Sequence, residues 1–264
     1  MAFPLIRQFN FVSFYMGRHY IYKHILEYAQ QSPSDKIPVF LDLGCCSEFY
    51  ICLSWASITH SLLTVGTDLR KLLQDGYPAS RSPPNVYGSD ILLDFITEGY
   101  KLYKDGPGRP SPTPIKFFAD EIFNIPPKAD GVTPVRPVGL NSLRGKVDIL
   151  YAGALFHVFA GKKQYGLAQR IVALINTNYS AERKNSETII FGRHMGSQEP
   201  TKNRRPKKHG GAFDHSPSSW HQLWETVLVE AFGTGILQNV EIHAELVEEW
   251  LLWSVVLRLP LNGL

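Results

Sequence analysis

The chain has 264 residues, of which 44% are hydrophobic and 19% are charged, and its formal net charge is +3. This balance is typical of a globular protein with a substantial core and excludes a largely disordered chain. The charge is too small to indicate a nucleic-acid partner, because nucleic-acid binding needs a basic face or stripe.

Apolar periodicity and turn residues predict helices and strands that alternate along the chain. In chain order, a helix is expected over residues 20–30, a strand over 39–44, a helix over 67–75, a strand over 85–90, a helix over 91–103 and a strand over 115–120. A strand over 147–153, a helix over 164–176, a strand over 188–192, a helix over 219–232 and two β-like stretches over 236–246 and 250–259 follow. This order predicts an α/β fold with a mostly parallel sheet and an antiparallel last strand. One domain over 39–264 is expected, behind a helical lead over 1–38.

The chain shows no sign of export or of membrane insertion. Its first residues lack the basic start and the apolar block of an export signal, and residues 49–65 are too polar for a membrane span. The three cysteines, Cys45, Cys46 and Cys52, lie close together and lack the spacing of a metal site. We therefore expect no membrane span, no bound metal and a reducing, cytoplasmic compartment.

Acidic residues stand at the carboxyl ends of the first three predicted strands. Asp42 and Gly44 end the first strand, Asp90 the second and Asp120 the third. Ligands of parallel sheets lie beyond the carboxyl ends of the strands, where a carboxylate can accept the hydroxyl groups of a ribose or an adenine amino group. The alternative is that these acids merely cap the helices that follow them.

The glycine pattern separates two cofactor classes. A dinucleotide fold needs G-x-G-x-x-G directly after the first strand, whereas this chain has Gly44 and then no glycine until Gly66. An acid within the first strand suits a cationic sulfonium with an amino-acid tail better than a diphosphate. The sequence therefore predicts S-adenosylmethionine rather than a nicotinamide dinucleotide.

Several motifs resemble those of fungal methyltransferases of meroterpenoid and polyketide pathways. The motifs are Leu41–Cys46 resumed at Gly66–Leu72, Asn85–Asp90, Phe118–Asp120, Phe156–Phe159, Gln164, Gly192-Arg193-x-x-Gly196 and Trp220-x-x-x-Trp224. The resemblance covers most of the chain and implies a Rossmann-like, seven-stranded class I methyltransferase fold. It also implies an enzyme that methylates a carboxyl or hydroxyl oxygen of a small terpenoid or polyketide intermediate, and a homodimer.

The resemblance also implies roles for individual residues. The methionine part of S-adenosylmethionine would lie among Asp42, Gly44 and Gly66, the ribose at Asp90 and Ile91, and the adenine end at Asp120 and Glu121. His157 is expected to act as a general base or as a donor that positions the acceptor, and Gln164 to orient the acceptor. Arg193 and His194, which follow the predicted fifth strand, are expected to meet a substrate anion.

The chain departs from the resembled family at residues 47–65. Similar proteins have about one residue between the paired cysteines and the next glycine, whereas nineteen residues, Ser47 to Val65, stand here. We interpret this segment as translated intron sequence; the alternative is a real lid over the cofactor. A second function therefore stays open, that of a catalytically silent binding protein that keeps the fold without a working cofactor loop.

Overall fold

The computed structural model describes residues 14–45, 66–127, 139–177, 186–202 and 213–259. The contacts group the chain into two compact units, Met1–Asp120 and Glu121–Leu264. The helical lead belongs to the first unit, where the Tyr22 hydroxyl donates to Asp75 at 2.8 Å. The expected boundary at residue 39 stays a prediction, and residues 47–65 lie outside the described part of the chain.

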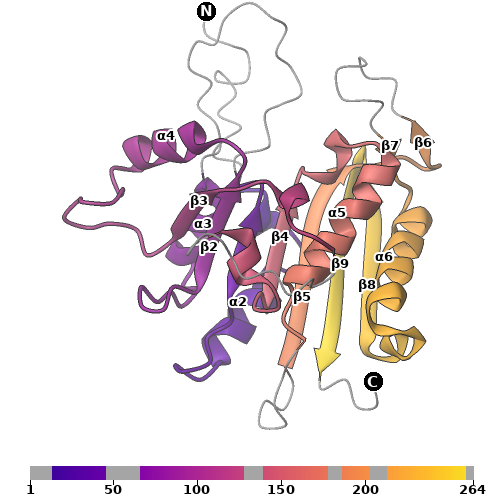
Figure 1. Cartoon of the computed structure of the whole chain (residues 1–264), viewed down its shortest axis with the longest axis horizontal. Coiled ribbons are helices and arrows are strands. Elements are labelled where there is room, and N and C mark those ends of the chain that lie inside the picture. The colour runs from indigo at the N-terminus through magenta and orange to yellow at the C-terminus, as the bar shows by residue number, and fades with distance from the viewer. Residues whose placement is uncertain (1–13, 46–65, 128–138, 178–185, 203–212, 260–264) are drawn as a thin grey trace, which may run out of the picture. The chain divides into compact units, whose positions relative to one another are not determined.

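The first unit has three parallel strands in the order β3-β2-β1 (Figure 1). Its elements are η2 Met16–Arg18, α2 Tyr22–Gln31, β1 Phe40–Leu43, α3 Thr67–Gln74, β2 Val86–Asp90, α4 Leu93–Tyr103 and β3 Lys116–Ala119. All four residues of β1 are buried, as is typical of a parallel strand that is covered on both faces. Gly88 in β2 makes room for the Phe117 ring, which would lie 2.5 Å from a Cβ at this position.

The second unit has four strands in the order β4-β5-β9-β8 and a separate antiparallel pair, β6-β7. Its elements are η4 Ile122–Asn124, η5 Leu140–Leu143, β4 Ile149–Gly153, η6 Phe156–Val158, α5 Gly161–Leu174, β5 Ser186–Met195, β6 Thr201–Lys202, β7 Phe213–Asp214, α6 Pro217–Phe232, η8 Thr234–Asn239, β8 Val240–Val247 and β9 Trp250–Leu259. Strands β4 and β5 are parallel, and β9 runs antiparallel to β5 and β8. Helices α5 and α6 lie side by side against these strands (Figure 1).

An aromatic cluster fills the core of the second unit. Trp220, Trp224, Trp253 and Phe156 are fully buried, and the Phe156 and Trp220 ring centroids are 4.8 Å apart. Large rings in edge-to-face contact contribute both buried area and geometric specificity. Trp220 and Trp224, one turn apart on α6, therefore pack in the core of this unit.

The predicted α/β alternation is confirmed, with seven strands in the orders β3-β2-β1 and β4-β5-β9-β8 besides the pair β6-β7, and an antiparallel strand at the end of the described chain. The fifth strand differs from its prediction, because β5 extends to Met195 and pairs with β9 along its whole length. Arg193 and His194 therefore lie inside a strand and not in the loop after it. No helix in the described residues is long and apolar enough to cross a membrane.

Candidate functional site

The first unit brings the three acidic residues predicted to bind the cofactor to one edge of its strands. Asp42 pairs with Gly88 in the register of β1 and β2, and Asp90 pairs with Ala119 in that of β2 and β3. The Asp120 N–H donates to the Asp90 carbonyl at 2.9 Å. Because all three strands are parallel, the acids share the carboxyl edge at which ligands of such sheets bind. We refer to Asp42, Asp90 and Asp120 as the acidic rim.

Asp90 combines a local structural role with a position suited to a ligand. Its Oδ1 accepts the Leu92 N–H at 3.1 Å. This bond closes a local turn and is not a helix cap, because the N-cap of α4 is Leu92, which has no side-chain cap hydrogen bond. The next residue, Ile91, is 58% exposed. An apolar side chain presented beside a buried carboxylate matches the two surfaces of a nucleoside, the ribose hydroxyls and the flat base.

Gly44 and Gly66 meet at the same edge, although twenty-one residues separate them in the sequence. Both have left-handed backbones, with φ of 80° and 74°. The Gly44 N–H donates to the Ser89 carbonyl at 2.8 Å, and the Gly66 N–H donates to the Cys45 carbonyl at 3.3 Å. A Cβ on Gly66 would lie 2.5 Å from the Phe117 ring, so only glycine fits this turn.

These observations fit a ligand that approaches the backbone closely. Among the described residues, the buried Ser89 hydroxyl at the same edge has no hydrogen-bond partner. Such a hydroxyl suits contact with a small polar group, for example an amino-acid tail. Glu121, predicted to act with Asp120, begins the second unit with an exposed side chain, and its role stays a prediction.

His157 lies in η6, after β4, and is 2% exposed. The Met195 N–H donates to its Nδ1 at 3.3 Å. A ring nitrogen that accepts a hydrogen bond carries a lone pair, so the neutral ring has its proton on Nε2. This tautomer makes His157 a donor at Nε2, which favours positioning of an acceptor over removal of its proton.

Gln164 is fully buried near the start of α5. Its Nε2 donates to the carbonyls of Phe159 at 2.9 Å and Phe213 at 2.6 Å. Since both partners can only accept, they fix which end of the amide is the nitrogen. Gln164 therefore ties the segment after η6 to β7. Its Oε1 has no hydrogen bond to the part of the chain that the structure describes, so this atom can still accept one.

Arg193 and His194 lie on opposite faces of β5. The Arg193 guanidinium lies over the Trp250 ring, 4.2 Å from its centroid. His194 is fully buried and accepts a hydrogen bond at Nδ1 from Trp253 at 3.0 Å. Burial, and then the charges of His157 and His215, lower the pKa of His194 well below 6.5. A neutral, buried ring gives no support to the predicted contact with a substrate anion, and we assign His194 to the core.

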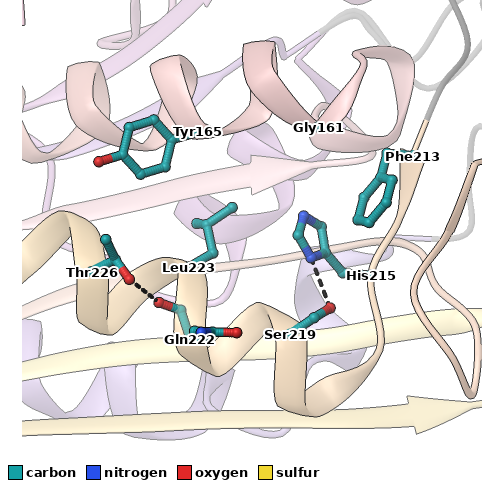
Figure 2. A pocket seen from close by; sticks show the side chains of 8 residues that line it. All are labelled: Gly161, Tyr165, Phe213, His215, Ser219, Gln222, Leu223 and Thr226. Atoms are coloured by element: carbon teal, nitrogen blue, oxygen red, sulfur yellow. Dashed lines mark hydrogen bonds between the residues drawn. The ribbon is translucent and has the colours of Figure 1, made fainter.

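A groove of about 360 Å³ lies between α5 and α6 (Figure 2). It is lined by Gly161, Tyr165, Phe213, His215, Ser219, Gln222, Leu223 and Thr226. Figure 2 shows His215 between the helices, with its Nδ1 bonded to the Ser219 hydroxyl at 2.9 Å. Burial lowers the pKa of His215 to about 4, so the ring is neutral at pH 7. None of the predicted site residues lines this groove, although Gln164 holds the carbonyl of its Phe213 wall.

The sequence interpretation missed a buried ion pair beside Gly66. Arg70 is 8% exposed and binds Asp105 through two hydrogen bonds. Arg70 lies in a run that carries the family resemblance, but nothing in the sequence indicates that an arginine on α3 turns inward. Its partner follows thirty-five residues later in a loop without a motif.

Comparisons with known proteins agree with this picture. No family model matches the chain. O-methyltransferase phiE of a fungal species (strain ATCC 74256) is 28% identical over 238 residues, methyltransferase trt5 of Aspergillus terreus 28% over 239, and asnovolin E/chermesin D methyltransferase nvfJ of Aspergillus novofumigatus 26% over 241. Each match covers 90% of the chain, which spans 63% of the length of phiE and 68% of trt5 and nvfJ. The resemblance to fungal methyltransferases is confirmed.

Solved structures align less closely. The CMeT domain of citrinin polyketide synthase gives a TM-score of 0.46 at 14% identity, over 86% of this chain and 48% of that domain. The DhpI–SAH complex gives a TM-score of 0.45 at 10% identity, over 98% of this chain and 100% of that chain. We therefore assign the fold from the order and direction of the strands. The orders β3-β2-β1 and β4-β5-β9-β8, with β9 antiparallel to its neighbours, are those of the predicted class I methyltransferase fold, which is confirmed.

Proposed function

We propose that the chain is an S-adenosylmethionine-dependent methyltransferase of fungal secondary metabolism that methylates an oxygen of a small-molecule intermediate. The acidic rim carries the proposal, because carboxylates at the ends of three parallel strands can accept ribose hydroxyls and lie near a cationic sulfonium. Similarity over 90% of the chain to phiE, trt5 and nvfJ supports methyl transfer as the reaction.

The relatives also support an oxygen acceptor. PhiE and atr3 of Stereocaulon alpinum are named O-methyltransferases, and the name of nvfJ specifies the compounds asnovolin E and chermesin D. We therefore propose a terpenoid or polyketide acceptor that carries a carboxyl or hydroxyl group. The proposal includes a cytoplasmic homodimer.

The first unit would hold the cofactor. Asp42, Gly44 and Gly66 would contact its methionine part, and Asp90 with Ile91 its ribose. Asp120 and Glu121 would contact the adenine end. When bound, S-adenosylmethionine supplies an electrophilic methyl group.

The second unit would prepare the acceptor. Arg193 would attract a carboxylate, and His157 would donate a hydrogen bond from Nε2 to an acceptor oxygen. A carboxylate fits this arrangement better than a hydroxyl, because an ionised oxygen needs no base and Nδ1 of His157 already accepts the Met195 N–H. Alignment of the acceptor oxygen with the methyl group would then be the main catalytic contribution.

The test combines binding with transfer. S-adenosylhomocysteine is titrated calorimetrically into the chain, and radiolabelled S-adenosylmethionine is then supplied with a panel of aromatic terpenoid acids and their methyl esters. We expect binding, and label transferred to the acids in a base-labile form but not to the esters. Binding without transfer to any acceptor would favour the silent binding protein, and absence of binding would contradict the proposal.

A further inference from the structure

The Arg70 side chain is enclosed by a carboxylate and two aromatic rings in the first unit. Its Nε donates to Oδ2 of Asp105 at 2.7 Å and its Nη2 to Oδ1 at 2.9 Å. The guanidinium lies 4.2 Å from the centroid of the Tyr103 ring and 5.0 Å from that of Phe117. Two rings and a bidentate carboxylate therefore fix both the plane and the rotation of this group.

The remaining edge of the guanidinium faces the glycine turn. Arg70 Nη1 donates to the Gly66 carbonyl at 3.2 Å, while the Gly66 N–H donates to the Cys45 carbonyl at 3.3 Å. The neighbouring side chain reinforces the contact, since the hydroxyls of Thr67 and Tyr103 are 2.8 Å apart. The start of α3 is thus held from one side by β1 and from the other by the end of α4.

We propose that Arg70 and Asp105 are positioning residues that hold the Gly66 turn in the conformation needed for cofactor binding. The inference rests on the proposed function. A buried ion pair is a weak source of net stability, because desolvation of both charges offsets their attraction. The pair is better explained by the geometry that it imposes. It aims a donor at the Gly66 carbonyl, at the first turn of α3.

The test compares Arg70→Lys with Arg170→Lys. Arg170 is a matched control in the second unit, because its Nη1 donates to the Gly166 carbonyl four residues earlier at 2.8 Å and its guanidinium lies 5.1 Å from the Phe123 ring centroid. Lysine keeps the charge at either position but loses the planar fork. Amide hydrogen exchange over residues 66–70 reports on the turn without any ligand, and calorimetry with S-adenosylhomocysteine reports on cofactor binding.

We expect Arg70→Lys to speed exchange at Gly66 and to weaken binding of S-adenosylhomocysteine by about tenfold. Arg170→Lys should leave both unchanged. In steady-state kinetics the loss should appear in the KM for S-adenosylmethionine more than in kcat. If Arg70→Lys does not fold, Asp105→Asn removes one arm of the pair while keeping its shape, and should change exchange and affinity in the same direction.

Three results would overturn the inference. Exchange in Arg70→Lys could match the control, affinity could stay at the unaltered value while exchange rises, or both lysine variants could lose affinity equally. Absence of binding by the unaltered chain would instead overturn the proposed function. The exchange comparison would still decide whether Arg70 and Asp105 hold the turn.

Discussion

Gly66 is a position of the candidate site at which a side chain cannot be accommodated. Its left-handed backbone and the Phe117 ring, 2.5 Å from a Cβ, both exclude a side chain. Gly108 is a matched control, with φ of 81° and nothing within 4 Å of its Cβ. We expect Gly108→Ala to lower the free energy of unfolding by roughly 1 kcal/mol through strain alone. Gly66→Ala should lose a further 1–3 kcal/mol or so through the clash, measured by urea unfolding. Equal losses in the two variants would contradict this account.

The tautomer of His157 distinguishes its two predicted roles. Glutamine can keep a donor near the Nε2 position, whereas asparagine keeps an acceptor near Nδ1 for the Met195 N–H. If His157 positions the acceptor, His157→Gln should retain roughly tenfold more kcat than His157→Asn. If it is a general base, both variants should lose kcat by about 10²–10⁴, and the acid limb of the pH–rate profile should disappear in both.

The sequence predicted residues at strand ends better than residues within strands. Asp42, Asp90 and Asp120 lie as expected because parallel strands bring their carboxyl ends together. His194 was placed after the fifth strand, and its inward direction depends on the pairing of β5 with β9, which no local pattern reveals. Arg70 was missed for a similar reason, since its burial depends on Asp105 in a distant loop.

At the scale of elements, the order of helices and strands could be predicted and their ends could not. Helix α5 begins at Gly161, three residues before its predicted start. The start could not be predicted because the N-cap residue is Ala160, whose side chain cannot form a capping hydrogen bond and so gives no sequence signal. Residues 236–239 form part of η8 and not of a strand. Helix α6 was predicted closely, because Pro217 and the hydrogen bond from the Ser219 N–H to the Ser216 hydroxyl mark its start.

The turn between β1 and α3 predicts the effect of removing residues 47–65. Replacing them by one phenylalanine leaves two residues between Cys45 and Gly66. The observed Gly66 N–H to Cys45 carbonyl bond then becomes the hydrogen bond of a β-turn. A shorter loop loses less entropy on closure, by up to about 2 kcal/mol here. We expect the shortened chain to unfold at an equal or higher urea concentration and to bind S-adenosylhomocysteine at least as tightly. Loss of folding or of binding would show that the segment is a working part of the protein.

At the scale of the whole molecule, buried histidines make stability depend on pH. Burial lowers the pKa of His215 from 6.5 to about 4, so the unfolded chain takes up a proton before the folded chain does. The contribution of His215 to the free energy of unfolding is therefore complete above pH 6.5 and is lost as the pH falls toward 4. At about 1.4 kcal/mol per pH unit, the loss from this group approaches about 3 kcal/mol. His194, whose pKa is also lowered, acts in the same direction.

Urea unfolding at pH 7.5 and at pH 4.5 measures this dependence. Between pH 7.5 and pH 4.5, we expect the free energy of unfolding to fall less in His215→Gln than in the unaltered chain, because glutamine does not titrate. The comparison uses the change with pH within each protein, since the variant also loses ring contacts with Phe213 and Trp220. An equal loss in both proteins would contradict the assignment to His215.

The central claim is that the acidic rim binds a nucleoside cofactor, and Asp90 tests it most directly. Asp90→Asn keeps an oxygen that can accept the Leu92 N–H while removing the charge. Asp94→Asn, at an exposed acid in the first turn of α4, is the control. Calorimetric titration with S-adenosylhomocysteine should show affinity at least about tenfold weaker for Asp90→Asn, with Asp94→Asn unchanged and both variants as stable as the unaltered chain. Equal affinity in all three proteins would limit Asp90 to its local hydrogen bond with Leu92 and contradict the account.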